Sequence, residues 1–225
     1  MRETAEIREW TGAFGQEYTD RNLLSPEAHD ALYGYDFGIS RKQLNQIFLQ
    51  GVPKDARILE VGCNIGNQLI LLQQMGYRNL FGIEVQPYAL KLARSRTRNI
   101  GFSQGSVFRI PESRPFDLVF TSRVLIHISI EDLDAAMDEI YRCAGTYVWG
   151  IEYYSPRVTE VNYRNRKGLL WKTDYSRLYL DRFKDLELVR EQRLPYLHNE
   201  NIDSMFLLRK KKKTDSAELG AVGQA

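Results

Sequence analysis

The chain has 225 residues, of which 43% are hydrophobic, and a formal net charge of +2. That length suffices for one sizeable core and argues for a single domain. Five of the positive charges lie in Arg209–Lys213, so the rest of the chain is slightly acidic, which excludes a globally basic nucleic-acid-binding protein.

The two cysteines, Cys63 and Cys143, have neither metal-ligand spacing nor the pattern of a disulfide framework. We therefore expect no metal site. No apolar run approaches the roughly 20 residues needed to cross a bilayer, and the N-terminus lacks the apolar centre of a signal peptide. These features predict a reduced, soluble, cytoplasmic protein without membrane association.

The hydrophobic pattern predicts alternating helices and strands along most of the chain. In chain order, we expect helices over 5–18 and 41–50, a strand over 57–61, a helix over 67–75, a strand over 80–84, a helix over 88–98 that starts at Pro87, a strand over 117–121, a helix over 130–142 and a strand over 146–151. Strands separated by helices of this length predict right-handed crossovers and a parallel sheet covered on both faces.

The last third of the chain has a different pattern. Two apolar runs, 186–194 and 204–208, have no helix between them, so we expect them to close the sheet as an antiparallel hairpin. Residues 213–225 are small, polar and aperiodic, which predicts a disordered tail.

The stretch LEVGCNIGN, residues 59–67, leaves a predicted strand, turns on glycines and enters a predicted helix. A phosphate-binding loop requires a lysine and a hydroxyl after its second glycine, whereas Asn67 and Gln68 follow Gly66 here. A dinucleotide-binding turn requires a central glycine, and Asn64 takes that place. The turn fits neither pattern, although it departs less from the second.

Carboxylates are expected at two adjacent strand ends. Glu60 lies two positions before Gly62, where it repels a pyrophosphate and favours a cationic ligand. Glu84 ends the next predicted strand, where a carboxylate accepts both hydroxyls of a ribose. The pair therefore indicates a nucleoside joined to an amino acid, with an ammonium and a sulfonium group, rather than to phosphate.

Four stretches, in order, resemble the motifs of class I S-adenosylmethionine-dependent methyltransferases. They are EVGCNIG at 60–66, GIE at 82–84, GSVFRIP at 105–111, and FDLVF at 116–120 followed by VLIHI at 124–128. The resemblance covers roughly residues 55–152. It implies a Rossmann-like fold with a seven-stranded, mostly parallel sheet and an antiparallel last strand. Asn64 replaces the central glycine of the family, and Ser106 replaces the acidic residue that reads adenine.

The resemblance implies S-adenosylmethionine as the cofactor. The hydroxyl of Ser106 or the backbone amide of Val107 then takes over the adenine contact. We expect the cofactor to be bound by Glu60, Gly62, Asn64, Gly66, Glu84, Val85, Ser106 and Val107, together with Tyr18 and Arg21 from an N-terminal lid.

The flanks resemble the methylases associated with pseudaminic acid biosynthesis, a pathway to a nine-carbon acidic sugar of bacterial surface glycans. The resembling stretches are WTGAFGQEYTDRN at 10–22 and EYYSP at 152–156. The resemblance implies a small, sugar-related acceptor.

An oxygen or ammonium acceptor must lose a proton during methyl transfer, so a base is expected near the strand ends. His127 follows the fourth predicted strand, and its ordinary pKa suits proton uptake at neutral pH. The alternative is a histidine that only packs or caps the next helix. Glu152 ends the fifth strand and is the second catalytic candidate, with a structural ion pair to an arginine as its alternative.

The aromatic and basic flanks have two interpretations each. Trp10, Phe14 and Tyr18 recur at four-residue spacing, which fits a helix core or a lid over the ligand. The basic segment 157–172 fits a solvated connection or recognition of an anionic acceptor by arginine forks. In the second case the acceptor is bound by Tyr153, Tyr154, Arg164, Arg166 and Trp171.

The sequence as a whole predicts three parts: a helical lid over 1–50, a methyltransferase domain over 51–212 with an acceptor-binding insertion around 155–180, and the tail. The predicted reaction is methyl transfer from S-adenosylmethionine to oxygen or nitrogen of a small anionic metabolite, such as an acidic sugar or nucleotide sugar. The alternatives are an RNA methyltransferase and a non-catalytic cofactor-binding partner. The oligomeric state stays open.

Overall fold

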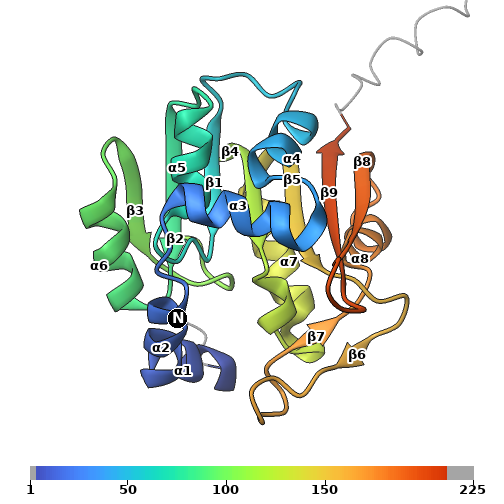
Figure 1. The fold of residues 1–225 in the computed structure, drawn as a ribbon. Coiled ribbons are helices and arrows are strands. Elements are labelled where there is room, and N and C mark those ends of the chain that lie inside the picture. The colour runs from blue at the N-terminus through green and yellow to red at the C-terminus, as the bar shows by residue number, and fades with distance from the viewer. Residues whose placement is uncertain (1–3, 212–225) are drawn as a thin grey trace, which may run out of the picture.

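The computed structural model describes residues 4–211, whose strands form one seven-stranded sheet in the order β3-β2-β1-β4-β5-β9-β8 (Figure 1). Strand β9 is antiparallel to both of its neighbours, and the pairings among the first five strands are parallel. The expected sheet is thus confirmed. The strands are β1 Arg57–Val61, β2 Asn79–Glu84, β3 Ile100–Gln104, β4 Phe116–Ser122, β5 Ala144–Tyr153, β8 Leu186–Pro195 and β9 Ile202–Lys210; the short β6 Thr159–Glu160 and β7 Trp171–Lys172 form a separate hairpin.

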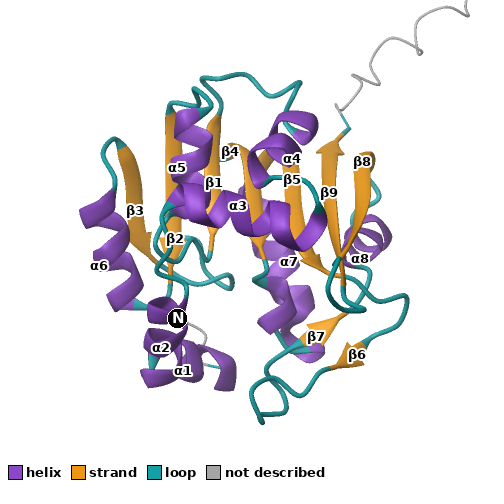
Figure 2. Ribbon diagram, in the orientation of Figure 1, coloured by secondary structure: helices purple, strands orange, loops and turns teal. Residues whose placement is uncertain are grey.

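Helices cover both faces of the sheet, with α3, α4 and α5 in front of it and α7 and α8 behind it in the view of Figure 2. The helices are α1 Ala5–Thr11, α2 Ala13–Arg21, α3 Pro26–Phe37, α4 Arg41–Phe48, α5 Asn67–Gln74, α6 Pro87–Arg96, α7 Ile130–Cys143 and α8 Tyr175–Arg182, with a 3-10 turn at Leu125–His127. Pro87 occupies the first helical turn of α6, as predicted.

Two apolar layers fill the space between the sheet and the helices. Successive strand residues point to opposite faces, so Ile58 packs in one layer with Leu44 of α4, and Leu59 in the other with Met137 of α7. Burial on both faces explains why the strands of this sheet have apolar runs rather than a strict alternation.

The predicted helix over 5–18 is wrong in one respect, because the structure contains two helices that meet at Gly12. The Gly12 amide still donates to the carbonyls of Arg8 and Glu9 at the end of α1, but the backbone of Gly12 is extended, so α1 ends there and α2 begins at Ala13. The break lets α1 and α2 pack against each other beside the carboxyl ends of β1 and β2 (Figure 1).

Besides the short strands β6 and β7 and the 3-10 turn, the sequence pattern did not locate α3, α8 and β3. Helix α3 begins at the Ser25 cap and buries only Tyr33 within the helix, so it lacks an apolar stripe. The residues that helix α8 buries are two tyrosines and a serine, so the sequence shows no clear apolar face there. Strand β3 is an edge strand with Gly101 in its interior, and its alternation is correspondingly weak.

The N-terminal helices have different surroundings. Leu44 and Phe48 of α4 lie in the apolar core, whereas α1 and α2 contribute residues to the cavity described below. Helix α3 contributes His29 and Leu32 to the same cavity, and we keep the term lid for α1 and α2, the second of which carries the predicted Tyr18. The predicted disordered tail, 213–225, lies outside the described residues. Among residues 4–211, no helix has the length and apolarity needed to cross a membrane.

Candidate active site

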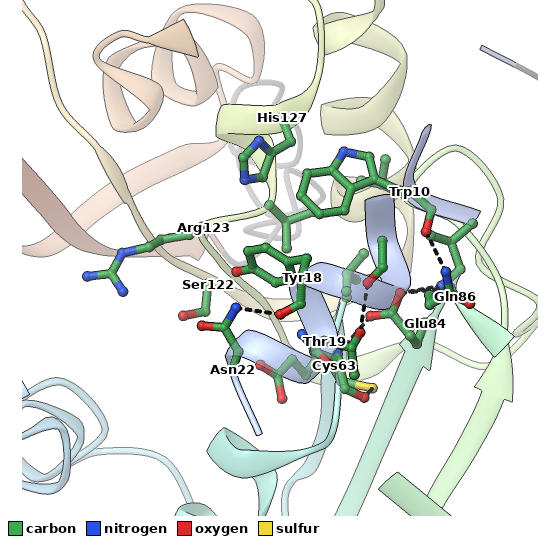
Figure 3. A pocket seen from close by; sticks show the side chains of 18 of the residues that line it. Trp10, Tyr18, Thr19, Asn22, Cys63, Glu84, Gln86, Ser122, Arg123 and His127 are labelled. Atoms are coloured by element: carbon green, nitrogen blue, oxygen red, sulfur yellow. Dashed lines mark hydrogen bonds between the residues drawn. The ribbon is translucent and has the colours of Figure 1, made fainter. Parts of the chain in front are cut away.

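A cavity of about 210 Å³ lies at the carboxyl ends of β1, β2 and β4, against helices α1 and α2 (Figure 3). It collects side chains from distant parts of the chain, as expected for the ligand-binding edge of a parallel sheet. Of the predicted site residues, the cavity brings together Tyr18, Glu60, Gly62, Asn64, Glu84, Val85, Ser106, Val107 and His127.

The turn after β1 uses its backbone amides within the protein. The amides of Gly62 and Cys63 donate to the Ile83 carbonyl at 2.9 and 3.0 Å, and the Asn64 amide donates to Glu84 Oε2 at 2.7 Å. A phosphate-binding loop has to offer such amides to its ligand. The contacts therefore give a physical reason why this turn is not built for phosphate.

Three residues of this turn, Gly62, Asn64 and Gly66, have left-handed backbone conformations. Gly62 has φ +71°, and a Cβ there would come within 2.6 Å of Val124. Asn64 has φ +45°, a conformation that asparagine tolerates better than most residues, so it replaces the central glycine without disrupting the turn. Its Oδ1 is buried without a hydrogen-bond partner in the structure.

The carboxylates of Glu60 and Glu84 are both buried at the cavity wall. Burial raises the pKa of Glu60 well above its ordinary value, with Arg41 opposing the shift and Glu84 adding to it. Burial likewise raises the pKa of Glu84, against the backbone amides that it accepts from Gln86, Asn64 and Val85. Among the described residues, Oε2 of Glu60 has no hydrogen-bond partner. Two desolvated acids side by side favour a cationic ligand.

Ser106 and Val107 form the wall of the cavity that follows β3. Both are buried, and the Ser106 hydroxyl accepts the Phe108 amide at 3.3 Å. The hydroxyl hydrogen and the second lone pair of Ser106 therefore remain for a ligand. Gly66, by contrast, caps α5 with φ +80° and does not line the cavity.

Helices α1 and α2 are held over the cavity from the β2 side. Gln86 Nε2 donates to the carbonyls of Trp10 and Gly12, both at 3.0 Å, and Figure 3 shows the bond to Trp10. The Tyr88 hydroxyl donates to Asp20 at 2.8 Å. These bonds attach the lid directly after the strand that ends in Glu84.

The aromatic residues of the lid agree in part with both interpretations made from the sequence, a helix core and a lid over the ligand. Trp10 and Tyr18 line the cavity, with their ring centroids 5.1 Å apart, whereas Phe14 packs edge-on against Trp10 and Tyr163. Burial raises the pKa of Tyr18 to about 12. Arg21 does not line the cavity and lies 3.8 Å from Glu17 on the exposed side of α2.

His127 lies in the 3-10 turn after β4 and lines the cavity, with its ring 4.5 Å from that of Trp10 (Figure 3). Its Nδ1 is 2.7 Å from the Leu169 carbonyl. Because a carbonyl only accepts, Nδ1 carries the hydrogen, and Nε2 is left with a free lone pair. Burial lowers the pKa of His127 to about 4, although the Leu169 carbonyl opposes the shift.

Glu152 lies beneath the same turn rather than in the cavity. It is fully buried, and its carboxylate accepts the amides of Val124 and Ile126 at 3.3 Å each. Burial raises the pKa of Glu152 to about 7. These contacts involve no arginine and hold the turn that carries His127, so the position of Glu152 fits an orienting role.

Replacing Glu152 is expected to change how stability depends on pH. Because the folded pKa lies above the ordinary value of 4.5, the stability that protonated Glu152 contributes is complete below pH 4.5 and is lost as the pH rises through 7. The wild type should lose about 1 kcal/mol more between pH 6.5 and 8.5 than Glu152→Gln. Urea unfolding at both pH values measures this difference, and parallel curves for the two proteins would contradict it.

The insertion after β5 touches the lid. Arg166 forms an ion pair with Glu9 of α1 and lies 4.9 Å from the Phe14 ring centroid. The Tyr163 ring lies 5.5 Å from that of His127. Arg164, predicted to bind the acceptor, is exposed and has φ +53°. We refer to residues 159–172, which include β6 and β7, as the insertion hairpin.

The other predicted acceptor residues lie around the insertion hairpin and outside the cavity lining. Trp171 is buried, and its carbonyl accepts the Tyr175 hydroxyl. Tyr153 lies 5.3 Å below the ammonium group of Lys172, and Tyr154 lies 3.6 Å from the guanidinium of Arg193. The structure therefore places these residues on one side of the site without bringing them into one binding surface.

Several lining residues were not predicted from the sequence, namely His29, Gln86, Ser122 and Arg123. Ser122 and Arg123 directly follow the apolar part of β4. Glu60 and Glu84 were selected because they lie at the ends of predicted strands, and the same criterion, applied to β4, would have selected Ser122 and Arg123. His29 comes from the unpredicted helix α3 and had no local signal.

The sheet order with its single reversed strand, and a cavity at the carboxyl ends of the parallel strands, define the class I S-adenosylmethionine-dependent methyltransferase fold. Residues 58–145 match the family model for a methyltransferase domain. The match covers less than half of the chain, with further helices before it and the insertion hairpin after it.

The chain is 29% identical over 84 residues to an uncharacterized methyltransferase of Alkaliphilus oremlandii (strain OhILAs), a match covering 37% of this chain and 38% of that protein. The 1,6-didemethyltoxoflavin-N1-methyltransferase of Burkholderia thailandensis, with bound 1,6-didemethyltoxoflavin and S-adenosylhomocysteine, superposes with a TM-score of 0.67 at 14% identity, over 94% of this chain and 93% of that one. Magnesium protoporphyrin IX methyltransferase from Synechocystis PCC 6803 with bound S-adenosylmethionine gives 0.65 at 13% identity, over 94% and 100%. At these identities the two structures share the fold with this chain.

Proposed function

We propose that this chain transfers a methyl group from S-adenosylmethionine to oxygen or nitrogen of a small anionic metabolite. The observation that carries the proposal is the pair of buried carboxylates, Glu60 and Glu84, at adjacent strand ends of one cavity. A cationic amino-acid nucleoside suits both acids, whereas a pyrophosphate does not.

The lining residues fit this cofactor. Glu84 accepts the ribose hydroxyls, the unpartnered Oε2 of Glu60 faces the ammonium group, and Ser106 with the Val107 amide receives adenine. When bound, the cofactor supplies an electrophilic methyl group and its leaving group. The protein then has to orient the acceptor, exclude water and remove a proton.

His127 is the proton acceptor in this proposal. Its Nδ1–H is fixed by Leu169, so Nε2 is the basic atom, and the rings of Trp10 and Tyr163 restrict water around it. Glu152 orients the turn that carries His127. The lid, α1 and α2, excludes water from above.

The acceptor in this proposal is an acidic sugar or nucleotide sugar of bacterial surface glycan synthesis, such as the pseudaminic acid pathway, in the cytoplasm. The support is the sequence resemblance of the flanks, which form the lid and the region after β5 in this structure. The Burkholderia enzyme of the same fold, whose structure holds 1,6-didemethyltoxoflavin, also supports a small-molecule acceptor.

Calorimetric titration with S-adenosylmethionine, S-adenosylhomocysteine and, as a control, NAD tests the cofactor. We expect binding of both sulfur nucleosides and none of NAD. Folded protein that binds neither sulfur nucleoside would overturn the proposal. Transfer of a labelled methyl group to acidic sugars, their neutral analogues or tRNA then tests the acceptor, and methylation of tRNA alone would replace the small-molecule assignment.

A further inference from the structure

A second charged region lies at the other end of the cavity from Glu84. Arg123, directly after β4, lines the cavity, and its guanidinium points away from the group formed by Trp10, Tyr18 and Glu84 (Figure 3). Its backbone has φ +56°, and its amide donates to the Ile151 carbonyl at 2.8 Å. The left-handed turn therefore fixes the direction in which this arginine leaves the strand.

The guanidinium of Arg123 is held in one orientation. Nε and Nη2 donate to Asp203 Oδ2 at 3.1 and 2.8 Å, and Nη2 donates to the Tyr196 hydroxyl at 2.9 Å. Among the hydrogen bonds of residues 4–211, Arg123 uses only these two nitrogens, so both Nη1 hydrogens remain for a ligand. Its side chain is 22% exposed, whereas that of Asp203 is not exposed at all.

The rings around Arg123 come from three parts of the chain. The centroids of Tyr33, Phe37, Tyr153 and Tyr196 lie 5.2 to 6.0 Å from its guanidinium carbon. Such a setting lowers the local dielectric, which strengthens a charge-assisted hydrogen bond to a ligand.

Two further cations lie near this group without an ion pair among residues 4–211. Arg41 is fully buried, donates from Nη1 to Tyr33 at 2.8 Å and to Ser122 at 3.3 Å, and has an unpartnered Nη2. Lys172 shares Tyr153 with Arg123, lies 5.3 Å from that ring and donates to Asn201. The carboxylates that act on this group are Asp203, which pairs with Arg123, and Asp36. Burial raises the pKa of Glu60, the other acid near Arg41. Three cations therefore face two carboxylates, and this balance favours an anion.

We propose that Nη1 of Arg123 binds the carboxylate of the methyl acceptor, that Lys172, which contacts the same Tyr153 ring, adds positive charge, and that Asp203 and Arg41 position these groups. This inference rests on the proposed function and identifies the part of the site that selects an acidic acceptor. We assign the binding of the acceptor to Arg123 rather than to the arginines of the insertion hairpin, because Arg166 is paired with Glu9 and Arg164 is exposed. A guanidinium edge suits a carboxylate because it offers parallel N–H donors.

The test uses the full chain saturated with S-adenosylhomocysteine, and calorimetry establishes that saturation first. Nitrogen and carbon NMR signals of the arginine guanidinium groups are followed during titration with acetate, acetamide and inorganic phosphate, and Arg123→Lys assigns the Arg123 signal. We expect acetate to shift that signal saturably, acetamide to leave it unchanged and phosphate to act more weakly than acetate.

Three outcomes would overturn the inference: no saturable shift with acetate, an equal response to acetamide, or tighter binding of phosphate. Arg123→Lys keeps a charge for Asp203 and should weaken acetate binding more than tenfold, measured by calorimetric titration with acetate because the variant lacks the Arg123 signal, while S-adenosylhomocysteine still binds. Arg177→Lys, on the exposed surface, is the matched control and should change neither. A wild type that fails to bind S-adenosylhomocysteine contradicts the proposed function instead. The acetate titration is then run on the protein without S-adenosylhomocysteine, and it still decides whether Arg123 binds a carboxylate.

Discussion

Glu84→Ala should weaken binding of S-adenosylhomocysteine by at least about 100-fold. Each hydrogen bond to a charged group is worth about 1.5–3 kcal/mol, and the carboxylate is proposed to make two of them to the ribose. The substitution also removes the acceptor of the Asn64, Val85 and Gln86 amides, so the turns on both sides of the nucleoside lose their anchor. Calorimetry at constant pH measures the affinity.

Two variants separate binding from general damage. Glu84→Gln keeps one carbonyl oxygen for these amides and should fall between the wild type and Glu84→Ala in affinity. Glu187→Ala removes an exposed carboxylate that pairs with Arg209 on β8 and β9, and it should bind as the wild type does. Unchanged affinity in folded Glu84→Ala would remove Glu84 from the ribose site.

His127→Ala should lower kcat by about 10²–10⁴-fold and leave S-adenosylhomocysteine affinity within a few-fold of the wild type. A positioned base contributes roughly that factor to catalysis, and only the acceptor step requires the base. Methyl transfer to the acceptor found in the labelling assay, measured under saturation, gives kcat and KM separately. Loss through KM alone, with kcat intact, would assign His127 to packing.

The pH dependence gives an independent measure of the same residue. Burial lowers the pKa of His127 to about 4, so activity should show no His127 transition near pH 6.5 and should fall only as the pH approaches 4. The stability that the neutral ring contributes is complete above 6.5 and is lost as the pH falls through 4. Nitrogen NMR of the imidazole should show hydrogen on Nδ1, and titration near 6.5 or hydrogen on Nε2 would contradict this assignment.

The parts of the fold that follow from local pattern were predictable. Strand β1 agrees with its prediction at both ends, and the meeting of Glu60 and Glu84 followed from parallel strand ends lying at one edge. Helix α3 was not predictable from the sequence, because Tyr33 is its single buried residue and one residue gives no apolar repeat.

The acceptor side of the site was less predictable because long-range contacts decide it. The sequence indicated an arginine-rich insertion, but Arg166 is occupied by Glu9, a residue 157 positions away in the chain. The same holds for His127, because its tautomer is set by the Leu169 carbonyl of the insertion hairpin and its pKa is lowered by burial. The spacing of the motifs predicted that His127 lies after the fourth strand, but it did not predict which ring nitrogen carries the hydrogen.

The contacts between the insertion hairpin and the lid also matter for protein engineering. Arg166 with Glu9, and Tyr163 with Phe14, join two segments that are separated in the chain by the entire methyltransferase domain match. A hairpin grafted from a relative to change acceptor preference would meet a foreign α1. Chimeras of this scaffold therefore need to exchange the first two helices and the hairpin as one cassette.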